Sequence, residues 1–312
     1  MKLITNQQVS ELVTTADAVQ AMREAFAAAG SGAQQARVRT SASNGVMLSM
    51  MGAVIPDAGI AGAKVYTTIK GAFKFVITLF STETGAPLAT IEGDTMTGLR
   101  TAAATAVACD ALARKDVETL AIIGTGVQAR SHIPALLQVR KFKEILIAGI
   151  SGQQELADEV ATTYGVSARV VEIDDAVRQA DVLVTVTRAT TPLFSGDLIK
   201  PGAFVAAVGA SKATVRELDD LAIKRAAALV VEWKPQAQIE AGDLVQCAPG
   251  TFDWANVWEL GQAVDGSIGY KRQEGKDGKD DDIVIYKAIG IGLEDVALAG
   301  LAYRKAAAQN GW

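Results

Sequence analysis

The sequence predicts an α/β fold in which a doubly wound parallel sheet is joined to an α+β domain. Two patterns carry this prediction. After residue 115, short apolar segments rich in β-branched residues alternate with stretches of helical spacing, as parallel strands and their crossover helices do. Before residue 116, several strand-like segments follow one another directly between two helical stretches, which favours an α+β domain.

The N-terminal region is expected to form the α+β domain. Residues 15–29 have helical spacing, and residues 97–114 form an Ala-rich helix that leads into the next domain. Between these helices, Glu83-Thr84-Gly85 is a plausible hairpin turn. The strand-like segments of the same interval are 46–51, 63–69, 75–81 and 87–91.

The segment Leu120–Arg130 is the most informative part of the chain. A short apolar strand runs into a G-x-G-x-x-A turn, which then opens an amphipathic stretch. In a dinucleotide site Gly124 would allow the tight turn, Gly126 would let backbone N–H groups approach a pyrophosphate, and Ala129 would keep the helix close to the sheet. A helix beginning near Val127 directs its positive end at phosphate. An ordinary strand-to-helix connection gives the same short pattern, so the flanking segments decide.

The segments after this turn are those of a Rossmann-type sheet. Helical spacing at 153–164 and 174–179 is that of crossover helices. The apolar, β-branched segments that predict the further strands are 144–148, 168–171, 182–186, 203–208 and 227–231. Because these segments carry few charges, both faces of the sheet should be covered.

The C-terminal part is expected to hold one more strand, at 283–286, and a long helix, at 292–308, which could return to pack on the first domain. Residues 271–282 are almost entirely charged or glycine, so they are expected to form an exposed loop with a hairpin tip.

Composition excludes several classes of protein. A chain of 312 residues with 49% hydrophobic and 21% charged residues can bury substantial cores and is expected to form two domains. The net charge of −5 gives no basic footprint for nucleic acid. No stretch approaches the roughly 20 apolar residues of a membrane helix, and the N-terminus becomes polar too early for a signal peptide. Cys109 and Cys247 fit neither a disulfide framework nor a zinc pattern, so a cytoplasmic location is expected.

Several short strings recur in a characteristic order and spacing along the chain. The strings are Gly85-Ala-Pro-Leu-Ala89, Leu99-Arg-Thr-Ala-Ala103, Gly124-Thr-Gly-Val-Gln-Ala129 with His132, Ala207-Val-Gly-Ala-Ser211, Arg216-Glu-Leu-Asp219, Glu240-Ala-Gly-Asp243, Glu259-Leu-Gly261 and Tyr286-Lys-Ala-Ile-Gly290. No single string is decisive, but through their order and spacing the chain resembles the ornithine cyclodeaminase and mu-crystallin family over nearly its whole length.

The resemblance implies a fold, an assembly and a type of reaction. Residues 1–115 with 290–312 would form a substrate-binding and dimerisation domain, and residues 116–289 a Rossmann domain. A homodimer is implied. Family activities include ornithine and lysine cyclodeamination, alanine dehydrogenation and ketimine reduction. All exchange a hydride between a nicotinamide and the carbon that lies between a nitrogen and a carboxylate.

This chemistry requires cations in the first domain, because a substrate carboxylate must be oriented and arginine pairs with it in a bidentate way. Arg39 and Arg100 lie where the family places such arginines. For Arg39 the alternative is a solvated charge on an irregular segment, whereas Arg100 opposes the dipole of its helix and needs a separate reason to be there. Lys64 lies among apolar residues of a predicted strand, where burial would lower its pKa and suit it to proton transfer. The alternative for Lys64 is an edge-strand lysine that discourages strand pairing.

Other polar residues are weaker candidates. Lys70 and Lys74 are more plausible as surface charges. His132, the only histidine, follows the glycine turn by more than one helical turn, so packing or an indirect contact is expected, and no metal site is implied. Ser211 stands where the cyclodeaminases of the family carry an aspartate. A serine hydroxyl is a poor base near neutral pH, although it can bind a substrate nitrogen or a water, and the string around it is similar to mu-crystallin.

The cofactor is expected to be NADP or NAD. In NAD-binding Rossmann domains an acidic residue after the second strand holds the ribose hydroxyls, but residues 149–152 contain no charge. Ser151 and local amides could accept a 2′-phosphate, which gives NADPH a slight preference. The residues expected to contact the cofactor are Gly124, Thr125, Gly126, Val127, Gln128, Ser151, Thr187, Val208 and Gly209.

The sequence thus predicts a homodimeric NAD(P)H-dependent enzyme that reduces small cyclic 2-imino acids such as 1-pyrroline-2-carboxylate. Arg39, Lys64 and Arg100 would bind the carboxylate, and Lys64 or a water held by Ser211 would manage the proton. An ornithine cyclodeaminase or an alanine-type amino-acid dehydrogenase is the first alternative. The second is a non-catalytic protein that binds NADPH or another small molecule.

Overall fold

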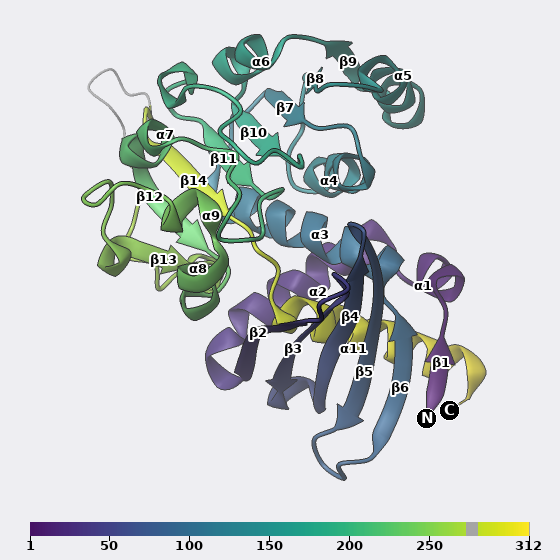
Figure 1. The fold of residues 1–312 in the computed structure, drawn as a ribbon. Helices are drawn as coiled ribbons and strands as arrows, with labels where there is room; N and C mark the ends of the chain where they lie inside the picture. The colour runs from purple at the N-terminus through teal and green to yellow at the C-terminus, as the bar shows by residue number, and fades with distance from the viewer. Residues whose placement is uncertain (273–279, 312) are drawn as a thin grey trace. The chain divides into compact units, whose positions relative to one another are not determined.

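The computed structural model describes residues 1–272 and 280–311, and its chain divides into two compact units (Figure 1). Met1–Ala104 with Gly290–Trp312 form unit 1, and Thr105–Ile289 form unit 2. The boundary falls inside helix α3 (Asp94–Leu112) rather than at residue 115, because this helix is continuous and contributes to both units. Most of the segment expected to be a hairpin tip, 271–282, lies outside the described residues.

Unit 1 contains a six-stranded sheet among its described residues, with the order β1-β6-β5-β4-β3-β2. Its strands are β1 (Lys2–Ile4), β2 (Ala33–Ser41), β3 (Met47–Ile55), β4 (Ile60–Ile69), β5 (Ala72–Ser81) and β6 (Pro87–Glu92). The pairs from β2 to β6 are antiparallel, and β1 pairs parallel with β6. The four strands expected in this region are present as β3 to β6, whereas β1 and β2, which holds Arg39, were not among the expected strands.

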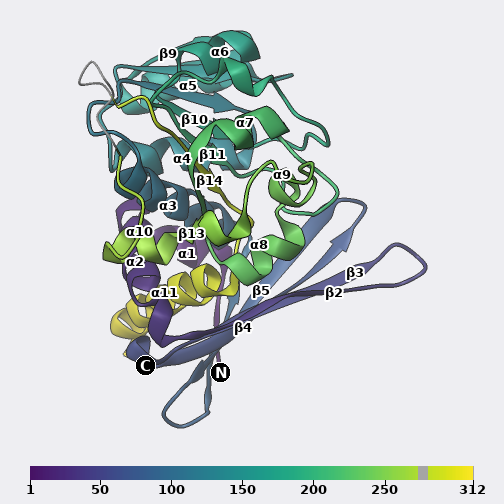
Figure 2. The same ribbon diagram turned by 90° about the vertical axis from the view of Figure 1, so that its left-hand side faces the viewer.

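One face of this sheet is covered by helices (Figures 1 and 2). These are α1 (Asn6–Leu12), α2 (Thr15–Ala27) and α11 (Gly292–Asn310), and short 3-10 turns lie at η1 (Ala29–Ser31) and η2 (Pro56–Ala58). Helix α11 packs directly on β3 and β4. A Cβ at Gly292 would lie 2.3 Å from the carbonyl oxygen of Gly52, so only glycine allows the start of α11 to approach β3 this closely.

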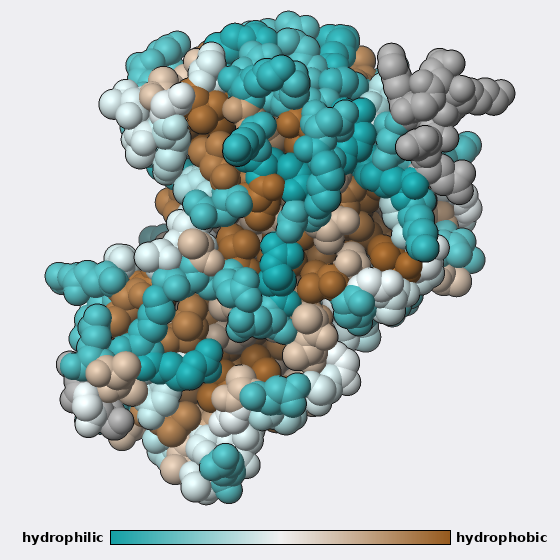
Figure 3. Space-filling view, turned by 180° about the vertical axis from the view of Figure 1, so that it is seen from behind, coloured by the Kyte–Doolittle hydropathy of each residue, from teal (hydrophilic) through white to brown (hydrophobic). Residues whose placement is uncertain are grey.

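The other face of the sheet carries apolar side chains that are exposed in the single chain. They come from β2, β3 and β5, where they alternate with residues buried under the helices. The members of this apolar face are Val38, Leu48, Met50, Val54, Val76 and Phe80. The opposite side of the unit, seen in Figure 3, mixes hydrophilic with hydrophobic residues.

Unit 2 contains an eight-stranded parallel sheet among its described residues, with the order β13-β12-β14-β11-β10-β7-β8-β9. Its strands are β7 (Thr119–Ile123), β8 (Glu144–Ala148), β9 (Ser167–Val170), β10 (Val182–Thr185), β11 (Phe204–Ala207), β12 (Ala226–Val231), β13 (Val257–Glu259) and β14 (Ile283–Lys287). From β7 the chain proceeds outward through β8 and β9 and then returns to β10 on its other side. This reversal is the topological switch point at which Rossmann-type sheets bind ligands.

The helices of unit 2 connect these strands. They are α4 (Val127–Leu137), α5 (Gln153–Tyr164), α6 (Ile173–Gln179), α7 (Asp220–Arg225), α8 (Lys234–Glu240), α9 (Gly242–Val245) and α10 (Leu260–Asp265), with 3-10 turns η3 (Gly196–Leu198) and η4 (Trp254–Asn256). Every residue of β10, β11 and β14 is buried, as expected for a parallel sheet covered on both faces. The last strand, β14, is inserted between β11 and β12, which sequence periodicity alone does not indicate.

Candidate functional site

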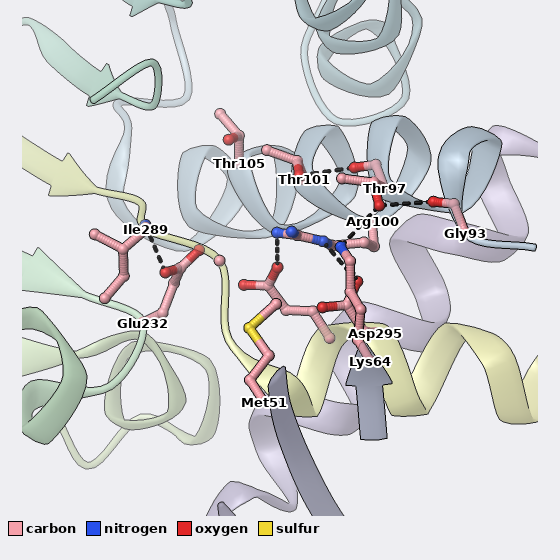
Figure 4. A network of polar contacts seen from close by, with 12 residues as sticks. Met51, Lys64, Gly93, Thr97, Arg100, Thr101, Thr105, Glu232, Ile289 and Asp295 are labelled. Atoms are coloured by element: carbon pink, nitrogen blue, oxygen red, sulfur yellow. Dashed lines mark hydrogen bonds and ion pairs between the residues drawn. The ribbon is translucent and has the colours of Figure 1, made fainter. Parts of the chain in front are cut away.

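Lys64 is the centre of a buried polar cluster in unit 1 (Figure 4). It lies on the helix-covered face of β4 and is 1% exposed. Its Nζ donates hydrogen bonds to Thr97 Oγ1 at 2.8 Å and to Asp295 Oδ1 at 3.0 Å. Thr97 lies near the start of α3, which also holds Arg100, whereas Asp295 lies in the first turn of α11. Three segments that are distant in the sequence therefore meet at this amine.

Arg100 joins the same cluster from α3. Its Nε donates to Asp295 Oδ1 at 3.2 Å, and its Nη1 donates to Glu294 Oε2 at 2.5 Å. Both carboxylates lie in the first turn of α11, where the helix dipole favours negative charge. Gly290 has a φ of +73°, and a Cβ there would lie 2.6 Å from Arg100 Nη1, so the glycine also makes room for the guanidinium.

Burial lowers the pKa of Lys64 from 10.5 to about 8. The charge of Asp295 opposes this change, whereas the charges of Arg100 and Arg37 add to it. A fully exposed lysine would hold its proton too firmly to exchange it near neutral pH. Lys64 is therefore suited both to bind an anion and to give up a proton.

Two arginines of β2 lie on the same face of the sheet as Lys64. The register of β2 against β3 shifts between Gln35 and Val38, and this bulge brings Arg37 next to Met51. Arg37 Nη2 donates to the carbonyl oxygen of Gly290 at 2.7 Å and contacts Met51 Sδ at 3.3 Å. Burial, and then the charge of Arg37, lower the pKa of Arg39, whereas its hydrogen bond with Tyr66 acts the other way.

The structure thus brings Arg39, Lys64 and Arg100 onto one unit, and Lys64 and Arg100 share Asp295. Sequence analysis missed Arg37, Glu294 and Asp295. Residues two apart on a strand face the same side, so treating 33–41 as a strand would have pointed to Arg37 beside Arg39. No comparable signal exists for the two carboxylates, because their partners lie far away in the chain.

Lys70 and Lys74 lie away from this cluster, at the β4–β5 turn. Lys70 is exposed and has a φ of +50°, a left-handed value that suits a tight turn. The Lys74 side chain is 84% exposed and forms an ion pair with Asp94 at 3.2 Å. Both are surface charges, as the sequence indicated.

The glycine-rich turn of unit 2 follows β7. Gly124 has a φ of +117°, and a Cβ there would lie 2.7 Å from the carbonyl oxygen of Val186, so no other residue fits. A Cβ at Gly126 would meet nothing within 4 Å. The turn is thus open in front of Gly126 and of the first residues of α4, where Val127 is 73% exposed. An open turn before the N-terminus of a helix is where a pyrophosphate binds.

The segment after β8 closes the other side of this turn. Thr125 Oγ1 donates to the carbonyl oxygen of Ser151 at 2.7 Å, which connects the two loops. The next acidic side chain along the chain is Glu155, and it forms an ion pair with Arg130 at 3.1 Å. The Oε1 atom of Gln128 is buried without a hydrogen-bond partner among the described residues. The residues present therefore fit the phosphate and ribose parts of a dinucleotide.

The loops after β10 and β11 hold the remaining expected contacts, Thr187, Val208, Gly209 and Ser211. The carboxylate of Glu217 accepts hydrogen bonds from Thr187 N at 2.8 Å and from Gly209 N at 2.7 Å. These two amides are therefore engaged within the protein, and the outer surface of the loops is what a cofactor can contact. Ser211 is partly exposed on the second loop.

His132 is buried, and both of its ring nitrogens have partners within the protein. Its Nδ1 lies 2.7 Å from the carbonyl oxygen of Gln128, and its Nε2 lies 3.0 Å from Thr105 Oγ1. Burial lowers its pKa to about 4, so the neutral ring donates to Gln128 and accepts from Thr105 at neutral pH. In the described part of the chain, no group of three or more His, Cys, Asp or Glu residues is arranged to hold a metal ion. No helix of that part is long and apolar enough to cross a membrane.

Comparisons of the sequence with known proteins give one family and several relatives. The sequence profile of the ornithine cyclodeaminase/mu-crystallin family matches residues 1–310. A Delta(1)-pyrroline-2-carboxylate reductase of Bacillus cereus is 35% identical over 262 residues, which are 82% of this chain and 76% of that protein. The ketimine reductase mu-crystallin of Mus musculus is 35% identical over 228 residues, which are 73% of this chain and 68% of that protein.

Solved structures share the fold. A probable ornithine cyclodeaminase from Bordetella pertussis Tohama I has a TM-score of 0.95 at 47% identity, covering 100% of this chain and 99% of that one. Thermococcus litoralis Delta(1)-pyrroline-2-carboxylate reductase, in complex with NADH and L-proline, has a TM-score of 0.92 at 28% identity, with coverages of 100% and 98%. An archaeal alanine dehydrogenase dimer with bound NAD has a TM-score of 0.91 at 28% identity, with coverages of 99% and 97%.

Proposed function

This chain belongs to the ornithine cyclodeaminase/mu-crystallin family, and we propose that it is an NAD(P)H-dependent oxidoreductase that reduces small cyclic 2-imino acids. The leading substrate is 1-pyrroline-2-carboxylate, on which the Bacillus cereus relative is named to act. The observation that carries the proposal is the buried cluster of Lys64, Arg100 and Asp295 in a chain whose other unit contains an open dinucleotide turn. The first supplies recognition of a carboxylate, and the second supplies recognition of a nicotinamide cofactor.

In this mechanism Arg39, Lys64 and Arg100 hold the carboxylate, so that the imine carbon is oriented for reaction. A bound NAD(P)H would supply the hydride that this carbon accepts. The nitrogen would gain a proton, so that the C=N bond becomes an amine. Lys64 can hold that proton at Nζ because its pKa is about 8, and a water bound by Ser211 is the other candidate donor.

Ser211 favours reduction over cyclodeamination. The cyclodeaminases of the family carry an aspartate at this point, which can accept a proton from the substrate amine, whereas a serine hydroxyl cannot act as a comparable base. An ornithine cyclodeaminase or an alanine-type dehydrogenase is the alternative enzyme. A non-catalytic protein that binds NADPH is the alternative of another class.

The segment after β8 supports NADPH over NADH. Residues 149–154 contain no acidic side chain that would repel a 2′-phosphate. Glu155, the first acid that follows, already pairs with Arg130. Ser151 lies exposed in this segment, beside Thr125. Its hydroxyl and the neighbouring backbone amides are the proposed partners of the phosphate.

We also propose that the chain is a homodimer that uses the apolar face of the unit 1 sheet. Six large apolar side chains of β2, β3 and β5 are exposed there in the single chain, and such a contiguous face is typical of an interface. The related alanine dehydrogenase is described as a dimer. A cytoplasmic location is proposed from the two cysteines, neither of which forms a disulfide.

The experiment that tests the function is a substrate screen. Oxidation of NADPH and of NADH is followed with 1-pyrroline-2-carboxylate, with 1-piperideine-2-carboxylate, and with pyruvate plus ammonia. Steady turnover of one of the cyclic imines is expected, with NADPH favoured. Binding of NADPH without turnover of any of these compounds would instead support the non-catalytic alternative.

A further inference from the structure

Glu217 is a fully buried carboxylate in unit 2 that the proposed mechanism does not use. Its side chain accepts hydrogen bonds from Thr185 Oγ1 at 2.8 Å, Thr187 N at 2.8 Å, Thr187 Oγ1 at 2.7 Å and Gly209 N at 2.7 Å. Each carboxylate oxygen therefore receives two donors. An ionised carboxylate has four acceptor positions and no donor, so this side chain is fully satisfied by its surroundings.

These donors belong to two different loops. Thr185 and Thr187 lie at the carboxyl end of β10, and Gly209 lies at the carboxyl end of the adjacent strand β11. A Cβ at Gly209 would lie 2.5 Å from Glu217 Oε1 and 2.3 Å from the carbonyl oxygen of Thr187. Only glycine permits this approach. Because Glu217 accepts hydrogen bonds from both loops, it fixes the spacing between them.

Glu217 is itself held by a second buried carboxylate. Asp243 Oδ1 accepts hydrogen bonds from Glu217 N at 2.6 Å and Leu218 N at 2.8 Å, and Asp243 Oδ2 lies 2.9 Å from Lys287 Nζ. Lys287 also donates to the carbonyl oxygen of Ala210 at 2.6 Å. The loop after β11 is thus fastened on one side by Glu217 and on the other by Lys287.

The place of this network in the sheet indicates what it positions. Strand β7, with its glycine turn, neighbours β10, and the turn packs against the loop after β10 through Gly124 and Val186. In a Rossmann sheet the pyrophosphate lies at the first turn, the adenosine lies toward the strands on one side, and the other half of the dinucleotide lies across the switch point. Here β8 and β9 are on the adenosine side, and β10 and β11 are on the nicotinamide side.

We propose that Glu217 is a positioning residue for the nicotinamide half of the cofactor. It sets the separation of the loops after β10 and β11, and it acts through Thr187 and Gly209 without touching the reacting atoms. This inference rests on the proposed nicotinamide-dependent function. It predicts that a change at Glu217 affects the nicotinamide end of the cofactor and leaves the adenosine end intact.

The test is Glu217→Gln in the full-length protein. The amide nitrogen of glutamine cannot accept the two hydrogen bonds that one carboxylate oxygen receives, so the loops must separate. Loss of buried hydrogen bonds to a charged group should raise the dissociation constant of NADPH by about tenfold or more. The constant for 2′-phospho-ADP-ribose, which lacks nicotinamide, should stay near that of the parent. NADH and ADP-ribose form a second pair of probes, and the fluorescence emission of bound NADPH reports the surroundings of the nicotinamide directly.

Asp181 supplies a matched control at the opposite edge of the same sheet. It is buried just before β10 and also receives several hydrogen bonds, from Glu118 N, Thr119 N, Arg114 and Lys200. Asp181→Asn should lower the Tm, but it should leave the ratio of the two dissociation constants unchanged. If Glu217→Gln fails to fold, Thr185→Val is the second variant. Valine has nearly the shape of threonine, so this change removes one of the four hydrogen bonds to Glu217 and should raise the same ratio by a smaller factor.

The outcomes separate the two claims. If the parent protein binds neither NADPH nor NADH, the proposed function is wrong. The second outcome is that the parent binds them and Glu217→Gln lowers the Tm as Asp181→Asn does, while the ratio of the dissociation constants for NADPH and 2′-phospho-ADP-ribose stays unchanged. If the emission of bound NADPH is also unchanged, Glu217 has only a structural role. An increase in the ratio confined to the Glu217 and Thr185 variants supports the inference.

Discussion

The candidate sites of the two units are built in different ways. The candidate site of unit 1 is built from charged side chains of distant segments, as in the contact of Lys64 on β4 and Arg100 on α3 with Asp295 on α11. The turn of unit 2 is built from backbone and glycine, as in the contact of Gly124 with Val186 and the open space at Gly126. A site made of charges depends on the identity of each side chain, whereas a site made of backbone depends on the absence of side chains.

The largest expected effect is on the charge-built site. Arg100→Met should lower kcat/KM strongly, with a loss of about 2 to 5 kcal/mol in the free energy of transition-state binding. The reason is that it removes a buried cation and leaves Glu294 and Asp295 without this partner. Steady-state kinetics with 1-pyrroline-2-carboxylate measure this change. The affinity for NADPH, measured by fluorescence titration, should stay close to that of the parent.

Lys74→Met is the matched control, because this cation lies on the same sheet but is exposed and pairs with Asp94 outside the cluster. Its kcat/KM should equal that of the parent. An Arg100→Met protein with near-normal kcat/KM would remove Arg100 from the site and would weaken the distinction between the two units.

The second prediction addresses the backbone-built site. Gly126→Val should abolish NADPH binding while the protein stays folded, because a Cβ there meets nothing within 4 Å but the added side chain would fill the space of the pyrophosphate. Gly124→Val should instead destabilise the protein, because the left-handed φ and the carbonyl oxygen of Val186 both exclude a side chain. Thermal unfolding and fluorescence titration distinguish the two. A Gly126→Val protein that binds NADPH as tightly as the parent would contradict the assignment of the turn.

The third prediction is a pH dependence that only the charge-built site should show. Lys64 has a pKa of about 8 in the folded protein, so its amine is mostly protonated below pH 8 and loses its charge above it. Imine reduction needs this proton and positive charge, so log kcat/KM should fall as the pH rises through about 8. Lys64→Met should have a low kcat/KM without this step. If the variant showed the same fall in log kcat/KM near pH 8, another group, such as a water at Ser211, would be the proton donor.

The smallest expected effect concerns a charge pair of unit 1 outside the cluster. Asp17 caps α2 together with Thr14 and pairs with Lys305 at 2.6 Å, and these hydrogen bonds lower its pKa to about 2. Asp17→Asn should cost about 1 kcal/mol of unfolding free energy, with kcat/KM and NADPH affinity unchanged. Because the folded pKa lies below the usual 3.8, this contribution is present at neutral pH and is lost as the pH falls from about 4 to about 2. A matching loss of activity would mean that the cluster does not function independently of α2.

Sequence patterns predicted the backbone-built site better than the charge-built one. The G-x-G-x-x-A turn lies within one continuous segment, so the sequence alone predicts the tight turn at Gly124 and the close backbone approach at Gly126. Asp295 is separated from Lys64 by 231 residues, and no local pattern indicates such a contact. The same holds for the insertion of β14 beside β11 and for Glu217, whose importance depends on strands that become adjacent only in the folded sheet.

The strand β2 shows a second reason for failure. Its polar sequence, Gln34 to Thr40, lacks the apolar alternation that identifies a strand, because Arg37 and Arg39 occupy positions on its inner face. Charged residues occupy the positions at which the prediction depends on apolar ones. Local rules fail where a protein uses a core-facing position for chemistry.

We propose that this protein, which carries a serine at position 211 where the cyclodeaminases of the family carry an aspartate, reduces imines and does not cyclodeaminate. The most direct measurement compares two reactions of the parent protein. One is NADPH oxidation with 1-pyrroline-2-carboxylate, and the other is ammonia release from ornithine with NAD. We expect proline to form from the imine in step with NADPH oxidation, and little or no ammonia from ornithine. Efficient conversion of ornithine to proline and ammonia, with no reduction of the imine, would contradict the account and would show that a group other than the residue at position 211 serves as the base.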